Sequence, residues 1–107
     1  MSFDAVSSDD SDDNPSTVRH EGDLDIVTSE DVKRQLAEIV EGGSPTVTLD
    51  LRNVGFVDSS GLGALVALHH FAESRGSQLV VKAAPSHVKD LFNLTRLDKL
   101  LTIEDRD

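Results

Sequence analysis

The stretch FVDSSGLGAL, residues 56–65, places an acid, two hydroxyls and two glycines between two apolar segments. Before it, TVTLDL at residues 46–51 alternates apolar and polar side chains, which is the period of a strand with one buried face. After it, the front half of an expected helix from about Ser60 to Arg75 is apolar almost all round, and Gly76 ends this helix. The stretch is therefore predicted to join a buried strand to a buried helix.

A second helix is predicted on the N-terminal side of this junction, with Thr28 as its N-cap and Gly42 at its end. Four apolar residues recur on one of its faces at the spacing i, i+4, i+7 and i+8, namely Val32, Leu36, Ile39 and Val40. Such an amphipathic helix covers a sheet. Residues 16–25, which precede it, have weaker strand character that is interrupted at Gly22.

On the C-terminal side, residues 78–84 are predicted to form a strand, Pro85 to open a short helix, and residues 100–105 to form an edge strand. Strands that alternate with helices imply parallel neighbours joined by right-handed crossovers. We therefore predict an α/β fold with four to five strands and about three helices, packed mainly on one face of the sheet.

Composition separates an N-terminal arm, residues 1–15, from a single domain at residues 16–107. The arm begins MSFDAVSSDDSDDN, which contains five Asp and no Lys or Arg, a composition typical of a flexible acidic segment. It has room for a short first strand around its few apolar residues. The arm is therefore left out of the predicted core.

The charge of the chain narrows the class of partner. Twenty acids against ten Lys and Arg leave a formal net charge of −10, which repels nucleic acid and anionic membranes, although such acidity can also serve solubility alone. A protein partner with a basic face fits better. The chain has no cysteine, no apolar run of the ~20 residues that a membrane span needs, and no signal-peptide pattern. We expect a cytoplasmic protein.

Three kinds of chemical site are disfavoured by the sequence, so we expect no catalytic residue, metal or cofactor. The Gly-x-Ser-x-Gly elbow of a serine hydrolase is missing around Ser59 and Ser60. Adjacent histidines His69 and His70 project about 100° apart on a helix, so we expect no shared metal ion. A helix start offers amide groups to a phosphate, but the lysine of a phosphate-binding loop is absent.

A structural role explains part of the junction. Ser59 or Ser60 is expected to cap the helix, while Gly61 and Gly63 allow close packing. A cap accounts for one acid or hydroxyl, however, and not for the whole run Asp-Ser-Ser-Gly-Leu-Gly.

The segment VTLDLRNVGFVDSSGLGALVALHHFAESRGSQLVVKAAPSHVKDLFNLTRLDKLL strongly resembles the STAS domain, in particular bacterial anti-sigma-factor antagonists. EGDLDIVTSEDVKRQL matches the family's Gly-Glu-Leu-Asp-x-x-Thr-Ala stretch, with Asp23 in place of the usual Glu. The resemblance covers about Thr17 to Ile103. It implies a small mixed sheet with helices on one side.

The resemblance also implies a switch. Ser59, directly after the acid, is the implied phosphorylation site, and Ser60 is the second candidate. The implied partner-binding surface comprises Asp25, Asp50, Asp58, Ser59, Ser60, Gly61 and Leu62. Gly61 and Gly63 are expected to let a kinase approach the serine, so that Gly61→Val impairs phosphorylation more than stability.

The implied partners are an anti-sigma factor with GHKL-type serine kinase activity and a metal-dependent serine phosphatase. The chain is expected to be a monomer and the substrate of both enzymes. In its unphosphorylated form it binds the anti-sigma factor, and the sigma factor is then released. Two alternatives stay open: a STAS subunit of a signalling scaffold or lipid-transport complex, and a STAS protein that binds a small ligand or nucleotide.

Overall fold

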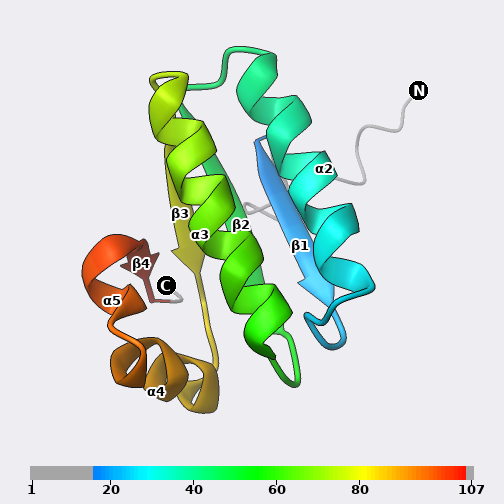
Figure 1. Cartoon of the computed structure of the whole chain (residues 1–107), viewed down its shortest axis with the longest axis vertical. Coiled ribbons are helices and arrows are strands. Elements are labelled where there is room, and N and C mark those ends of the chain that lie inside the picture. Colours follow the sequence, from blue (N-terminus) through cyan, green and yellow to red (C-terminus); the bar gives the residue numbers. More distant parts are fainter. Residues whose placement is uncertain (1–15, 106–107) are drawn as a thin grey trace, which may run out of the picture.

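Strands and helices alternate along residues 16–105, the part of the chain that this computed structural model describes (Figure 1). The elements are β1 (Thr17–Glu21), α2 (Thr28–Glu41), β2 (Thr46–Asn53), α3 (Ser59–Ser74), β3 (Gln78–Lys82), α4 (Ser86–Leu94), α5 (Leu97–Leu100) and β4 (Thr102–Glu104). No helix in this part of the chain has the length and apolar character needed to cross a membrane.

The four strands form one sheet in the order β1-β2-β3-β4, and each described pair of neighbours is parallel. The register aligns the core side chains of all four strands, with Leu49 of β2 between Val18 and Val81, and Ile103 beside Val81. The predicted alternation and α/β fold are confirmed. The short first strand expected within the arm lies outside the described residues, as does any antiparallel pairing that it would add.

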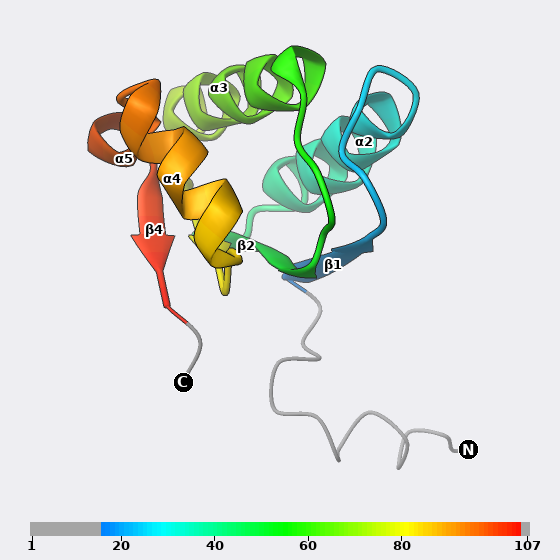
Figure 2. The same cartoon turned by 90° about the horizontal axis from the view of Figure 1, so that it is seen from below.

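The helices lie on one face of this sheet. Figure 2 shows α2 and α3 side by side over the strands, with α4 and α5 beside them near β4. Each predicted amphipathic face points into one core, to which the elements contribute fully buried residues such as Leu36, Leu49, Leu65, Val81 and Phe92. Burial of each such side chain contributes about 1.5–3 kcal/mol, so this shared core holds the helices in place.

One helix was not predicted. The single turn of α5 follows Arg96, whose backbone is left-handed with φ 66°, and it leads directly into β4. A four-residue helix is too short to show a helical repeat in a sequence, and its place is set by packing of Leu97 and Leu101 on the core. The expected edge strand is correspondingly shorter than residues 100–105.

Candidate functional site

The junction at residues 56–65 is built around Asp58. This residue has extended backbone, and its Oδ1 accepts a hydrogen bond from the Gly61 N–H at 3.0 Å, so Asp58 is the N-cap of α3. Ser59 and Ser60 are the first two residues of the helix. The expectation that one of the serines caps the helix is wrong, because the carboxylate one position earlier already occupies the capping position.

The two serines differ in exposure. Ser59 is exposed at the first position of α3, whereas Ser60 is half-buried at the second. The helix start therefore presents the Ser59 hydroxyl to solvent beside a carboxylate and close to the positive end of the helix dipole. Leu62, in the same first turn, is half-buried and packs on the core.

A short bridge joins this junction to the start of α2. Leu24 and Val57 pair as an isolated parallel bridge, in which the Leu24 N–H donates to the Phe56 carbonyl at 2.8 Å. The Asp58 N–H donates in turn to the Leu24 carbonyl at 3.1 Å. The bridge brings the N-terminal ends of α2 and α3 together, although they are about thirty residues apart in the sequence.

Gly61 is needed for this arrangement. The residue is buried, and a Cβ at this position would lie 2.6 Å from the Leu24 carbonyl oxygen and 3.0 Å from the Val57 side chain. Gly63, by contrast, has open space where its Cβ would be. The expectation that Gly61 belongs to the accessible surface is therefore wrong, and its close contacts lead us to expect a loss of stability when it is replaced. Its role is to let α3 approach the backbone of the 24–57 bridge.

Asp25 lies at the start of α2. Its Oδ1 accepts hydrogen bonds from the Thr28 and Val27 N–H groups, both at 3.0 Å. Thr28 is thus the first helical residue and not the N-cap that the sequence suggested. The hydrogen bond from the Thr28 backbone, assisted by those from Val27 and the Thr28 hydroxyl, lowers the pKa of Asp25 below its ordinary value of 3.8, against a smaller opposite effect of burial.

Asp50 lies elsewhere. Its neighbours Leu49 and Leu51 point into the core, so Asp50 projects from the opposite face of the sheet, away from the helices. There it is 0% exposed and pairs with Arg52 at 2.9 Å and with Arg19 at 3.5 Å. The expectation that Asp50 lines the surface around Ser59 is wrong, because strand alternation turns it to the other side and the arginines cover it.

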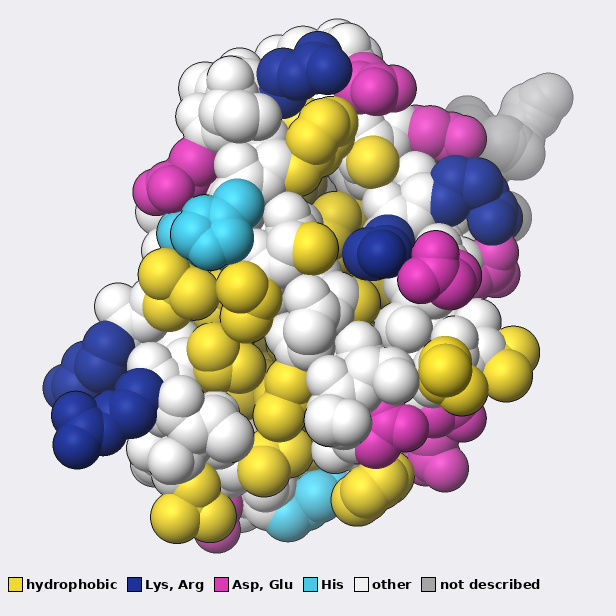
Figure 3. All heavy atoms as spheres, in the orientation of Figure 1, with side chains coloured by type: hydrophobic (Ala, Val, Ile, Leu, Met, Phe, Trp, Pro, Cys, Tyr) yellow, Lys and Arg dark blue, Asp and Glu magenta, His cyan; other side chains and the backbone are white. Residues whose placement is uncertain are grey.

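Three exposed apolar residues, which were not among the predicted site residues, lie around the helix starts. Ile26 is 70% exposed, Val27 76% and Phe56 57%. They lie in the two segments that the 24–57 bridge joins, and Figure 3 shows hydrophobic and acidic side chains exposed together at this end of the molecule. We call the set Asp25, Ile26, Val27, Phe56, Asp58 and Ser59 the helix-start surface. The sequence did contain a signal for this surface, because apolar residues stand shortly before the polar start of each helix.

His69 and His70, for which we expected no shared metal ion, lie close to each other and to Glu73. Their rings lie edge to face with centroids 5.2 Å apart, and together with Glu73 they offer ligand atoms that all lie within 4.8 Å of one another. Adjacent residues project about 100° apart on a helix, but the flexible side chains still bring one ligand atom of each residue within this distance.

Comparisons with known proteins identify the family of the chain. A family model described as "Mlab, STAS domain" matches residues 7–102. The anti-sigma F factor antagonist of Paenibacillus polymyxa is 31% identical over 91 residues, which cover 84% of this chain and 78% of that protein. The match therefore spans most of both chains.

Two solved structures have the same fold. The anti-sigma factor antagonist SpoIIAA, in its unphosphorylated form, superposes with a TM-score of 0.73 at 19% identity and covers 89% of this chain and 84% of its own. An anti-sigma factor antagonist from Mycobacterium paratuberculosis has a TM-score of 0.72 at 26% identity, with 82% of this chain and 74% of that chain covered.

Proposed function

The chain belongs to the STAS domain family, and from that premise we propose that it is an anti-sigma-factor antagonist switched by phosphorylation at Ser59. The unphosphorylated protein binds a cytosolic anti-sigma factor that is also a GHKL-type serine kinase, and the sigma factor is released. The kinase transfers the γ-phosphoryl group of ATP to the Ser59 Oγ, which gives up its proton while ADP leaves. A metal-dependent phosphatase then hydrolyses the phosphoserine and restores the binding form.

The observation that supports this proposal most is the position of Ser59. Its hydroxyl is exposed, and the cap of α3 is supplied by the Asp58 carboxylate rather than by a serine. Phosphorylation therefore removes no hydrogen bond that the helix start needs. The protein can lose and regain its phosphate without unfolding, as a reversible switch requires.

The charge of the phosphate has opposing effects on the fold. It adds about −1.5 to −2 charges at neutral pH. The positive end of α3 offsets this by about 0.3–1 kcal/mol for an exposed anion. Asp58, which already occupies the helix start, and Asp25 across the 24–57 bridge repel it. These contributions have opposite signs, and Ser59 makes no hydrogen bond that the cap needs, so we expect little change in structure.

Binding responds more strongly than the fold does. Ile26, Val27 and Phe56 are exposed apolar groups of the kind that anchor protein interfaces, and full burial of each is worth about 1.5–3 kcal/mol. A doubly charged phosphate beside them has to be desolvated when a partner covers this surface. A loss of about 2.8 kcal/mol already weakens affinity a hundredfold.

The proposal is tested by incubation with candidate anti-sigma kinases and ATP, followed by mass spectrometry of the peptides. We expect one phosphate on Ser59, no incorporation in Ser59→Ala, and normal incorporation in Ser60→Ala as the matched control. Phosphate on Ser60 alone, or none with any cognate kinase, would contradict the proposal.

A second candidate is a STAS subunit of a signalling scaffold or lipid-transport complex. It is favoured by the family model itself, whose description names Mlab beside the STAS domain. Affinity purification from the native cell separates the two candidates, because the first predicts an anti-sigma kinase that binds only the unphosphorylated form. The second predicts stable association with membrane or scaffold proteins whether or not Ser59 is replaced by Glu.

A further inference from the structure

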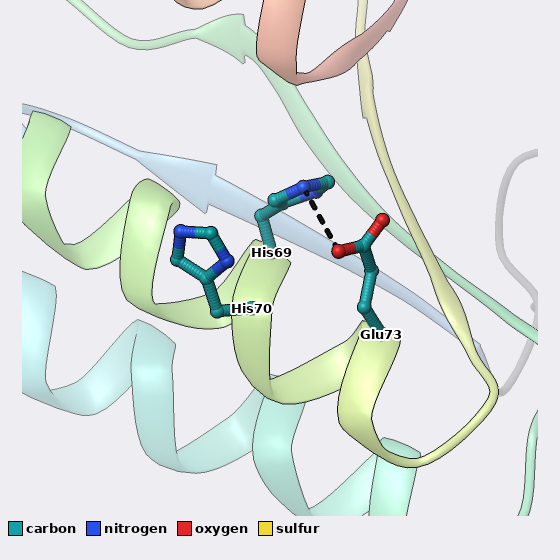
Figure 4. A group of neighbouring side chains, drawn as sticks. All are labelled: His69, His70 and Glu73. Atoms are coloured by element: carbon teal, nitrogen blue, oxygen red, sulfur yellow. Dashed lines mark ion pairs between the residues drawn. The ribbon is translucent and has the colours of Figure 1, made fainter.

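We propose that His69, His70 and Glu73, near the C-terminal end of α3, form a binding site for a divalent transition-metal ion such as zinc. Figure 4 shows the three side chains on neighbouring turns of the helix, with Glu73 paired to His69. We call them the α3 histidine cluster. The proposal concerns a part of the molecule that the proposed phosphorylation switch does not use.

The distances fit one shared ion after small rotations. His69 Nε2 lies 3.5 Å from Glu73 Oε1, and the potential ligand atoms of the cluster lie within 4.8 Å of one another. Zinc binds imidazole nitrogen and carboxylate oxygen at about 2.0–2.2 Å, so two ligand atoms on one tetrahedral ion are about 3.4 Å apart. The His69–Glu73 pair already has this separation. His70 is exposed and can turn toward the ion.

The sequence spacing places Glu73 beside both histidines, so that the carboxylate can link the two rings at one ion. Glu73 follows His69 by four residues and His70 by three, and both spacings place side chains next to each other on a helix. The carboxylate therefore lies within reach of both rings. The His69 side chain is only 14% exposed, which restricts its ring before any ion binds and lowers the ordering cost of binding.

The donor set selects the class of ion. Two imidazole nitrogens and one carboxylate oxygen suit zinc and related first-row ions, whereas magnesium and calcium prefer sites made entirely of oxygen. A water molecule or a group from another molecule completes the fourth position. The negative net charge of the chain further favours a dication.

The site is separate from the helix-start surface. His69 follows Ser59 by ten positions in α3, which at 1.5 Å per residue is a distance of about 15 Å along the helix. An ion bound here would join side chains of two successive turns and hold the last part of α3 against fraying. Zinc binding and Ser59 phosphorylation can therefore be tested independently.

The experiment is a calorimetric titration of the tag-free, metal-free full chain with zinc chloride, compared with His70→Ala and Glu73→Gln. Both replaced residues are exposed, so the fold should tolerate the changes. We expect one zinc per wild-type chain and an affinity that falls about tenfold or more in each variant. His87→Ala, which removes an exposed histidine on α4, is the matched control and should bind as wild type does. A hundredfold excess of magnesium should not displace the zinc.

A second measurement identifies the residues that bind the zinc ion. Zinc should shift the NMR signals of the His69 and His70 rings, and it should raise the thermal midpoint of the wild type more than that of His70→Ala. Absence of saturable binding, equal affinity in wild type and both cluster variants, or loss of binding in His87→Ala would each overturn the proposal. None of these outcomes bears on phosphorylation of Ser59, which a kinase assay measures separately.

Discussion

Single carboxylates determine how the two helix starts are built. Asp25 and Asp58 each accept amide hydrogen bonds at 3.0 Å at the beginning of a helix. The two serines between Asp58 and Gly61 therefore do not cap the helix, and Ser59 is exposed. Side chains that a sequence pattern places together thus divide into those that hold the backbone and those that are available to a partner.

The lowered pKa of Asp25 makes its contribution to stability depend on pH. Because its pKa in the folded chain lies below the ordinary 3.8, the ionised carboxylate stabilises the fold above that pH, and this stabilisation is lost as the pH falls through the folded pKa. We expect Asp25→Ala to lower the thermal midpoint at pH 7 and to differ less from wild type at pH 3. An equal difference at both values would show that the carboxylate charge has no part in the cap.

Gly61 and Gly63 are two residues apart, yet their replacements should differ. A Cβ at Gly61 would overlap the Leu24 carbonyl, so Gly61→Ala should destabilise the fold by about 1–3 kcal/mol. Gly63→Ala meets open space within a helix and should stabilise it by about 0.5–1 kcal/mol. Urea unfolding of both variants measures this. Equal effects would contradict the close approach of α3 to the bridge.

At the scale of elements, α3 is the helix on which the fold and both proposed sites depend. Its buried face, which includes Leu65 and Leu68, packs on the core, while its first turn presents Ser59 and its last turns present the α3 histidine cluster. The Asp58 cap and the buried face of α3 are therefore expected to affect stability, and the residues exposed along the helix to affect binding.

The cap of α3 gives a direct test of this division. Asp58→Ala removes the acceptor for the Gly61 N–H and should destabilise the protein by about 1 kcal/mol. Ser60→Ala, the matched control, removes no capping group and should change stability by less than about 0.5 kcal/mol. Chemical denaturation measures both, and a larger loss in Ser60→Ala would assign the cap to the serine after all.

At the scale of the whole molecule, the sheet has two faces with different chemistry. The helices cover the apolar face, and the other face holds Asp50 between Arg19 and Arg52. The helix-start surface lies where the bridged segments enter the helix layer and combines exposed apolar groups with carboxylates. This combination suits a protein partner that brings a basic rim around an apolar centre.

The exposed Phe56 should contribute to partner binding without contributing to the fold. Because its side chain is 57% exposed, Phe56→Ala should leave the thermal midpoint nearly unchanged. Loss of an aromatic anchor should weaken binding to the cognate anti-sigma factor about thirtyfold, which corresponds to ~2 kcal/mol. Titration calorimetry gives the affinity. A large fall in the midpoint with unaltered affinity would assign Phe56 to the core instead.

Local patterns in the sequence sufficed for much of the fold. The alternation at 46–51 and the helical repeat from Val32 to Val40 predicted their elements because strand and helix periods depend only on neighbouring residues. The alternation also placed Asp50 on the face of the sheet opposite to Leu49 and Leu51. The prediction that Asp50 belongs to the surface around Ser59 did not take this into account. The resemblance of residues 47–101 to the STAS domain identified the family.

Contacts between distant residues were decided only by the tertiary structure. The bridge of Leu24 to Val57 makes Gly61 a packing residue and brings Ile26 and Val27 toward the start of α3, and no local period encodes it. The short separation of the His69, His70 and Glu73 ligand atoms depends on side-chain rotamers, which the sequence spacing does not fix. The sequence by itself therefore determined the elements and the family, whereas packing between elements decided which polar residues hold the backbone and which remain exposed.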